Sequence, residues 1–355
     1  MLISAIRVIR GENMNSKTKH GGDVILLSHG GGGTRTRGLI DNIIRRNLDN
    51  PILARMDDAA CLTIPEPDLV FTTDSFVVQP IFFPGGDIGK LAACGTLNDL
   101  AMQGGEPRYL SLGLIMEEGF PIEDLERVIQ SLGAVCRETG VPVVTGDTKV
   151  IERGAGAGIL MNTAGIGVRR PGTDVHVSNA KPGDAVIVTG TLGDHGVAIM
   201  CCREGLKFES KLVSDVAPLW SLVKPLLEKI PDIHCLRDPT RGGLAAALCD
   251  IAEQSRAGIR IEESRIPLKK EVVGACRMLG LDPLNVANEG KAVVICAAAD
   301  ADKALKILRA LPLGKDACVI GRVEADPPGT VLLQTSACGE RIVEIPSGED
   351  LPRIC

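Results

Sequence analysis

The stretch from residue 87 to residue 102 reads DIGKLAACGTLNDLAM, and it indicates how the surrounding region folds. Ile88, Leu91, Leu97 and Leu100 recur at the intervals that bring apolar side chains to one face of a helix. Asp87 stands directly before them, where an aspartate side chain can cap the first backbone N–H groups. The stretch therefore predicts a buried helix that begins after Asp87.

Short apolar runs on both sides of this helix predict strands. The runs are Leu69–Thr73, Tyr109–Met116, Val141–Thr145 and Ile159–Val168. The first is expected to end at Asp74, and the third at Gly146 and Asp147. Helical spacing also predicts helices at Leu39–Leu48 and Ile122–Glu138.

The second half of the chain again mixes the two kinds of element. Helices are predicted at Val197–Arg203, Ser214–Lys229, Gly243–Ser255, Lys269–Leu279 and Ala301–Leu311. Strands are predicted at Ala185–Thr189, Ile259–Ile261, Ala292–Ala297, Cys318–Val323 and Val331–Gln334. Strands and helices mixed in both halves predict two α/β or α+β domains.

A chain of 355 residues is long enough for two domains with separate cores. The polar connector at 171–182 is the candidate boundary, which gives domains at 23–172 and 173–345. Residues 1–22 are predicted to be a disordered extension. Residues 346–355 contain two prolines and a glycine without periodicity, and they predict a flexible tail.

Composition excludes several classes of protein. Aromatic residues make up only 2% of the chain, and the net charge is -6 without a basic block, so nucleic-acid binding is not expected. No apolar run approaches the roughly 18 residues that cross a membrane. The 12 cysteines include no C-x-x-C pair, and most of them are interpreted as small buried side chains in a reducing cytoplasm.

Acidic residues gather beside the predicted strands and turns, where several carboxylates can converge on Mg²⁺ and nucleotide phosphates. The candidates are Asp57, Asp58, Asp74, Asp99 with its neighbour Asn98, Asp147 and Asp238. Each aspartate taken singly is better explained as a helix cap or turn residue. The set as a whole predicts a metal–nucleotide site.

Other candidates are open to two interpretations. Gly30–Gly33 would let backbone N–H groups approach a phosphate, but no Gly-Lys-Ser/Thr follows, and a hinge explains the stretch as well. Lys149, Glu289 and His195 are candidate general acids or bases, or ordinary surface residues.

Cys355 is the last residue, so its thiol would be exposed and reactive on the tail. The ten residues from Pro346 to Cys355 reach about 30 Å when extended, far enough to carry a bound group into an internal site. An incidental terminal cysteine is the alternative.

Together these motifs resemble the HypE family of hydrogenase maturation proteins, within the PurM-like superfamily of aminoimidazole ribotide synthetase. The segments that carry the resemblance are 82–91, 145–150, 193–196, 237–243 and the ending Pro352-Arg353-Ile354-Cys355. It covers residues 23–355, and the extension before residue 23 departs from the family pattern. It implies a two-domain fold whose N-terminal sheet forms a homodimer interface, with ATP bound near that interface.

The resemblance also implies a reaction and its partners. A carbamoyltransferase, HypF, would place a carbamoyl group on the thiol of Cys355. The protein would dehydrate that group to a thiocyanate with ATP and Mg²⁺, releasing ADP and phosphate. The cyano group would then pass to iron on a HypC–HypD complex, as the cyano ligand of [NiFe] hydrogenase.

Roles for single residues follow from the same resemblance. Cys355 would carry the substrate, and Lys149 and Glu289 would deprotonate it. The metal and nucleotide would be held by Asp57, Asp58, Asp74, Asp99, Asp147 and Asp238, together with Asn98. His29, Gly31 and Gly32 would close over the phosphates. His195 would contact the substrate or cap the following helix.

Two other functions are consistent with parts of the sequence. A small-molecule kinase or ligase of the same superfamily would not need Cys355. A scaffold protein whose terminal cysteine ligates iron would not need the aspartates beside the strands.

Overall fold

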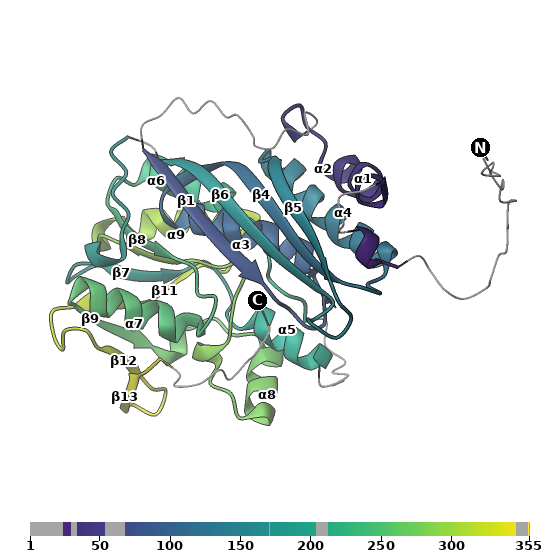
Figure 1. Cartoon of the computed structure of the whole chain (residues 1–355). Coiled ribbons are helices and arrows are strands. Elements are labelled where there is room, and N and C mark those ends of the chain that lie inside the picture. Colours follow the sequence, from purple (N-terminus) through teal and green to yellow (C-terminus); the bar gives the residue numbers. More distant parts are fainter. Residues whose placement is uncertain are drawn as a thin grey trace, which may run out of the picture.

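The computed structural model describes residues 24–29, 34–53, 68–169, 171–203, 212–345 and 354. The predicted extension at 1–22 lies outside these ranges, and so does the predicted tail apart from Ile354. Within the described ranges, two large sheets and their helices pack against one another (Figure 1). None of the described helices is long and apolar enough to cross a membrane.

The first sheet has the strand order β1-β6-β4-β5. Its strands are β1 (Leu69–Phe76), β4 (Gly105–Glu117), β5 (Val143–Ile151) and β6 (Ile159–Arg169). β4 and β5 are parallel and the other pairs are antiparallel. Helices α3 (Ile88–Met102) and α4 (Ile122–Thr139) lie on one side of this sheet (Figure 1).

Helix α3 is buried on nearly all sides, because it lies between the first sheet and the second half of the chain. Asp87 caps it as predicted, since the carboxylate accepts hydrogen bonds from Gly89 N (2.8 Å) and Lys90 N (3.0 Å). The helix packs against β1, β6 and β4, and it also contacts α4 and α6 (Trp220–Lys229). Its position makes α3 the element that links the two sheets.

The second sheet has the order β13-β12-β9-β11-β7-β10-β8. Its strands are β7 (Ala185–Val188), β8 (Ile233–Arg237), β9 (Gly258–Glu262), β10 (Val293–Cys296), β11 (Cys318–Glu324), β12 (Val331–Gln334) and β13 (Glu340–Val343). All neighbours are antiparallel except β12 and β9. Val186 and Val188 of β7 belong to a different buried cluster from Ile187, so the sheet buries both faces.

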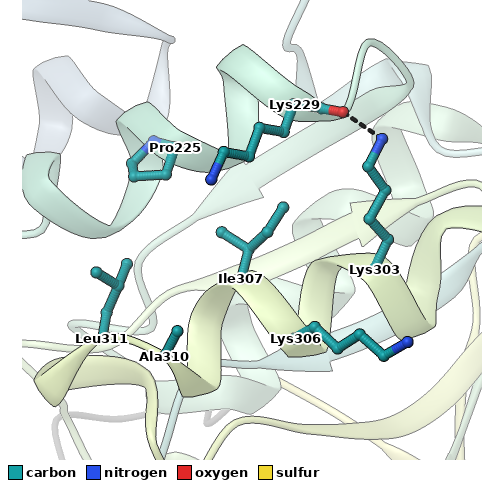
Figure 2. Close-up of a pocket in the computed structure, with 7 residues that line it drawn as sticks. All are labelled: Pro225, Lys229, Lys303, Lys306, Ile307, Ala310 and Leu311. Carbon is teal, nitrogen blue, oxygen red and sulfur yellow. Dashed lines mark hydrogen bonds between the residues drawn. The ribbon is translucent and has the colours of Figure 1, made fainter.

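The described residues of the second half form the helices α5 (Asp194–Arg203), α6, α7 (Gly243–Ser255), α8 (Lys270–Leu279) and α9 (Ala301–Arg309). Helix α7 joins the cluster on one face of the second sheet, and α6 and α9 join the cluster on the other. The apolar groove between α6 and α9 has a volume of about 390 Å³ and carries three lysines along its sides (Figure 2).

Shorter elements complete the described chain. Near the N-terminus, η1 (Leu27–His29) precedes a run of α1 (Thr34–Leu39), the π-helix η2 (Ile40–Arg45) and α2 (Arg46–Leu48). The two-stranded pair β2 (Phe82–Phe83) and β3 (Gly86–Asp87) leads into α3. Single 3₁₀ turns lie at Val177–Asn179, Glu263–Arg265, Pro283–Asn285, Ala298–Asp300 and Pro312–Gly314.

Two strand predictions of the first half are wrong at their ends. β5 does not stop at Gly146 and Asp147, but continues through Lys149 to Ile151 because its backbone pairs with β4 along this length. Asp74 likewise lies inside β1 rather than at its end. Asp147 and Lys149 are therefore strand residues, not turn residues.

The predicted helix at Ser214–Lys229 begins only at Trp220. The residues before it are held in a non-helical segment, which the proline at 218 favours because the residue before a proline avoids helical dihedral angles. Strands β8 and β13 were not predicted at all. This non-helical segment contains Asp215, which matters for the site.

Candidate active site

An acidic cavity of about 230 Å³ lies where the two halves of the chain meet. Its walls come from β1, α3, the loop after β8 and the turn before β10. The lining residues are Thr73, Asp74, Phe76, Gly95, Asp99, Asp238, Thr240, Arg241 and Glu289. Four of them are carboxylic acids and one is an arginine, so the cavity suits a polar ligand that binds cations.

The first sheet and α3 place two of the carboxylates. Side chains alternate between the two faces of β1, and Asp74 points to the same face as the buried residues Val70 and Phe76, which is the face toward α3. Gly95 of α3 leaves room there, because a Cβ on it would lie 2.8 Å from the ring of Phe76. Asp99 follows one turn later on α3, and its Oδ2 accepts a hydrogen bond from Thr72 Oγ1 (2.9 Å).

The second half supplies Asp238 directly after β8, and Arg241 three residues later. The Arg241 guanidinium donates to Asp74 Oδ1 at 3.3 Å, which joins the two halves across the cavity. Arg241 is itself mostly exposed, so its charge is available to a ligand at the mouth of the cavity.

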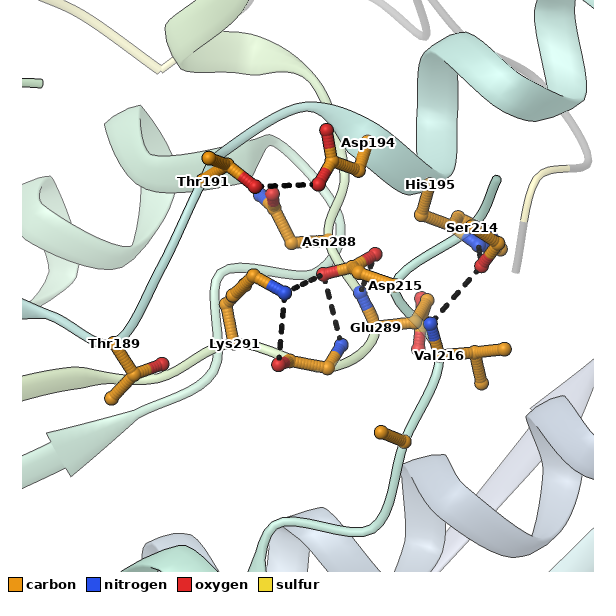
Figure 3. A network of polar contacts seen from close by, with 12 residues as sticks. Thr189, Thr191, Asp194, His195, Ser214, Asp215, Val216, Asn288, Glu289 and Lys291 are labelled. Atoms are coloured by element: carbon orange, nitrogen blue, oxygen red, sulfur yellow. Dashed lines mark hydrogen bonds and ion pairs between the residues drawn. The ribbon is translucent and has the colours of Figure 1, made fainter. Parts of the chain in front are cut away.

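Glu289 is almost fully buried, and its Oε1 has no hydrogen-bond partner among the described residues. Its turn is held by Asp215, which accepts hydrogen bonds from the backbone N–H groups of Glu289 and Gly290 (both 3.2 Å) and pairs with Lys291 Nζ at 3.3 Å (Figure 3). Only glycine fits at position 290, because a Cβ would lie 1.8 Å from the Asp215 carbonyl oxygen. The backbone of Glu289 is thus fixed while one carboxylate oxygen stays free to bind.

Burial and mutual repulsion change the acidity of the cavity carboxylates. Desolvation, followed by the charge of Asp99, raises the pKa of Asp238 from 3.8 to about 7. Desolvation also raises the pKa of Asp99, with Asp74 adding to the effect. Burial, Asp238 and Asp215 together raise the pKa of Glu289 well above its usual value. Like charges crowded around one cavity are the arrangement that a bound cation relieves.

This crowding predicts how the stability of the protein without ligands depends on pH. The folded-state pKa of Asp238 lies above its unfolded value, so its contribution is fully present below about pH 4 and is lost as the pH rises to about 7. The melting temperature is therefore expected to fall between about pH 4 and about pH 7, as calorimetry would measure, and Asp238→Asn is expected to flatten this fall. Asp316→Asn, at an exposed position, is the control. An unchanged pH profile in Asp238→Asn would contradict the expectation.

The structure brings only some of the predicted site residues to the cavity. Asp74, Asp99, Asp238 and Glu289 line it, as described above. Asp57, Asp58, Gly31, Gly32 and Cys355 lie outside the described residues, so their roles stay predictions.

Asp147 and Lys149 are exposed on β5, at the opposite edge of the sheet from Asp74. Three strand spacings, about 14 Å, separate the two edges. Within one chain, therefore, Lys149 and Glu289 are not brought together.

Two other predicted residues have defined partners. Asn98 donates to the carbonyl oxygens of Ala217 (3.1 Å) and Glu289 (3.2 Å), and its Oδ1 accepts from Leu219 N (2.8 Å). It joins α3 to the Glu289 turn, and contact with a nucleotide stays a prediction. His29 accepts a hydrogen bond from Leu26 N within its own turn.

His195 does not use its side chain to cap the helix in which it lies. It is fully buried in α5, where Nδ1 bonds with Ser214 Oγ (2.8 Å) and Nε2 with the carbonyl oxygen of Ile354 (2.7 Å). Ile354 is the residue before Cys355, and it is itself buried.

Sequence reasoning missed three residues that build the site. Arg241 lies in the motif at 237–243, but the sequence pattern indicated only Asp238 of that motif as a site residue. Asp215 was assigned to a helix, which hid its role. Asn288 accepts from Gly193 N (2.7 Å) and donates to Pro239 O (3.0 Å), so it links the loops before α5 and after β8. No local pattern identifies such contacts.

A divalent cation such as Mg²⁺ requires several oxygen ligands that converge on one point. In the described part of the chain, no three His, Cys, Asp or Glu side chains are arranged to hold a metal ion by themselves. Carboxylates with raised pKa values nevertheless face a shared cavity, which fits Mg²⁺ that takes part of its ligands from phosphate and water.

The family models match both halves of the chain. The N-terminal domain of AIR synthase related proteins matches residues 56–169, and the C-terminal domain matches residues 181–334. Fold and site together therefore define a two-domain AIR-synthase-related, PurM-like protein.

Individual relatives narrow this class. The carbamoyl dehydratase HypE of Rhizobium leguminosarum bv. viciae is 52% identical over 330 residues, which cover 93% of this chain and 94% of the relative. A crystal structure of the hydrogenase maturation protein HypE in complex with ATP is 46% identical, with a TM-score of 0.90 and coverage of 93% of this chain and 99% of that one. A chain of a HypE–HypF complex is also 46% identical, with a TM-score of 0.77 and coverage of 87% and 99%. The chain belongs to the HypE family of carbamoyl dehydratases, which confirms the resemblance seen in the sequence motifs.

Proposed function

We propose that this protein dehydrates a carbamoyl group on the thiol of its own Cys355 to a thiocyanate, with ATP converted to ADP and phosphate. In balance, R–S–CO–NH₂ and ATP give R–S–CN, ADP and phosphate. One observation carries the proposal beyond family membership. Ile354 is buried against His195, and the partner of His195, Ser214, is the neighbour of Asp215, which holds the Glu289 turn.

The acidic cavity is the proposed site of ATP and Mg²⁺. A HypE relative binds ATP, and the cavity of this chain offers Arg241 to the phosphates. Mg²⁺ would be held by Asp74, Asp99 and Asp238, with Asp57 and Asp58 as further proposed ligands. The metal would neutralise the charge of the triphosphate beside these carboxylates.

An amide oxygen is a poor leaving group, and bound ATP supplies the phosphoryl group that turns it into a good one. Glu289 then has the properties of the base. Its free Oε1 accepts a proton from the carboxamide nitrogen, and its raised pKa makes the carboxylate a stronger base than an exposed glutamate. Its burial keeps water away from the reacting carbon.

Lys149 and Asp147 require a second subunit to reach this site. One row of paired residues crosses the sheet from β1 to β5 on the side away from α3. It consists of Ser75, Asn162, Gly113 and Asp147. That side exposes apolar residues, with Phe71 69% exposed and Ile115 41% exposed. We propose a homodimer that covers this side, in which Lys149 of the partner subunit would reach the Glu289 cavity past β1, the edge strand of the sheet.

The remaining proposals concern partners, domains and location. HypF is the proposed donor of the carbamoyl group, since a HypE relative forms a complex with HypF. A HypC–HypD complex is the proposed cyano acceptor. The domain division at 23–172 and 173–345 follows the two sheets. The free thiols of the described cysteines support the cytoplasm as the compartment.

The requirement for the tail separates this function from that of a small-molecule kinase. The full-length chain, carbamoylated by HypF, is expected to hydrolyse ATP in step with thiocyanate formation. The chain that lacks residues 346–355 is expected to show no such turnover, either alone or with free carbamoylated thiols or small alcohols as acceptors. Phosphorylation of a free acceptor by the truncated chain at the rate of the full-length chain would favour the kinase instead.

A further inference from the structure

Ile354 packs against its own chain close to the C-terminus. This residue is 4% exposed, although it is the last but one of the sequence. A terminal residue is normally exposed, so its burial requires specific partners. Two kinds of contact supply them: a hydrogen bond to its backbone and an apolar environment for its side chain.

The hydrogen bond fixes the protonation of His195. The carbonyl oxygen of Ile354 only accepts, so His195 Nε2 must carry the proton and donate it. Nδ1 is then free to accept from Ser214 Oγ, whose oxygen in turn accepts from Val216 N (3.1 Å). Burial lowers the pKa of His195, which favours this neutral ring. Both ring nitrogens are thus hydrogen-bonded: Nε2 binds Ile354, and Nδ1 binds Ser214, which holds the ring in place.

The side chains around His195 favour an apolar residue at position 354. Ile354 belongs to the buried cluster that also contains Val197 of α5, Val216 and Val286. The ring of Phe83 packs edge-on against His195 with centroids 5.5 Å apart, which fixes the plane of the imidazole. Backbone and side chain of the tail are therefore both held at one place.

The segment that holds His195 and Ile354 in place also holds the Glu289 turn. Ser214 N donates to Pro84 O (2.7 Å), so the segment that carries Ser214 is fixed to the first domain just before α3. The next residue, Asp215, holds the backbone of Glu289 and Gly290 (Figure 3). Because Cys355 is covalently bonded to Ile354, an anchor at Ile354 limits the distance over which the terminal thiol can move.

We propose that His195 is a positioning residue that docks the C-terminal end of its own chain by binding the Ile354 carbonyl, while the Ile354 side chain is buried among apolar residues. The inference rests on the proposed function for its purpose, but docking itself does not require the reaction. It predicts that an undocked tail still carries its carbamoyl group and reaches Glu289 less often.

Docking is measured by digestion with a carboxypeptidase, followed by intact mass. The enzyme removes residues only from an undocked tail, so the trimming rate reports the undocked fraction. His195→Phe keeps a ring beside Phe83 and removes the donor, and it is expected to speed trimming about tenfold, as a lost hydrogen bond at a buried carbonyl implies. Ile354→Ala is expected to have a similar effect, and His195→Gln, which retains an N–H donor, to restore part of the protection.

His234→Phe is the matched control, because His234 is partly buried and bonds to Asp184 (2.7 Å) in the second domain. It should leave trimming unchanged. Equal trimming of wild type, His195→Phe and Ile354→Ala would overturn the proposal. Should His195→Phe fail to fold, Ile354→Ala decides alone, because a tail residue contributes little to the fold.

A second readout separates docking from the reaction. The rate of thiocyanate formation should fall about tenfold in both variants while the Kd for ATP stays unchanged, because neither residue lines the acidic cavity. Protection from trimming without any thiocyanate formation in the wild type would retain the docking site and refute the proposed function. Loss of ATP binding together with faster trimming would show general disruption and refute the positioning role.

Discussion

Glu289→Gln is expected to lower the rate of thiocyanate formation by about 10²- to 10⁴-fold, the range in which a general base contributes. Glutamine has nearly the same shape but cannot accept the proton. The turn should remain in place, because its hydrogen bonds to Asp215 and Asn98 come from the backbone of residue 289. Removing a buried acid beside Asp238 should leave the melting temperature equal or higher.

The measurement is single turnover of the carbamoylated chain with saturating ATP, quenched and analysed by mass. Glu253→Gln, at an exposed position of α7, is the matched control and should react at the wild-type rate. A Glu289→Gln protein that retains more than about a tenth of the rate would remove Glu289 from the role of base.

The same variant tests the arrangement of the proposed homodimer. Lys149→Ala and Glu289→Gln are each expected to be inactive when assembled alone. Random pairing of the two makes about half of the dimers mixed, and each mixed dimer has one complete site if the partner subunit supplies Lys149. Activity should then return to about a quarter of the wild type. No recovery in mixed dimers of two inactive variants would show that Lys149 acts within its own subunit, and full activity of Lys149→Ala alone would place Lys149 outside the site.

Cys355→Ala is expected to abolish thiocyanate formation completely, because the group to be dehydrated has no place of attachment. The change removes one sulfur from the end of the tail, so the fold and the ATP affinity should match the wild type. Calorimetry and equilibrium ATP binding check those two expectations, and mass analysis of the product checks the first.

Cys338→Ala is the matched control, since Cys338 is an exposed free cysteine in the second domain. It should form thiocyanate at the wild-type rate. Normal product formation by Cys355→Ala would show that the carbamoyl group is carried elsewhere, and it would remove the terminal thiol from the reaction.

Local sequence patterns predicted the elements whose causes are local. Helix α3 combines a capping aspartate with an apolar repeat, and its predicted and observed bounds agree. Helix α7 was predicted at Gly243–Ser255, as the structure has it. The acidic residues Asp74, Asp99 and Asp238 were also found from the sequence, because carboxylates beside strands are visible without the fold.

Long-range contacts determine the features that the sequence did not reveal. β5 extends past Gly146 only because β4 offers a partner strand. Asp215 stands in a segment whose conformation is set by Asn98, more than a hundred residues earlier. The bond between His195 and Ile354 spans 159 residues, so its existence follows from the packing of α5 and the tail and from no nearby motif.

The most direct measurement of the central claim is the intact mass of the C-terminal peptide after each step. The chain is first incubated with HypF, carbamoyl phosphate and ATP, and it is then isolated and given fresh Mg-ATP. The proposed dehydration predicts a carbamoyl adduct on Cys355 that loses the mass of one water in the second step. A Cys355 that stays unmodified while HypF is active, or an adduct that never loses water, would contradict it.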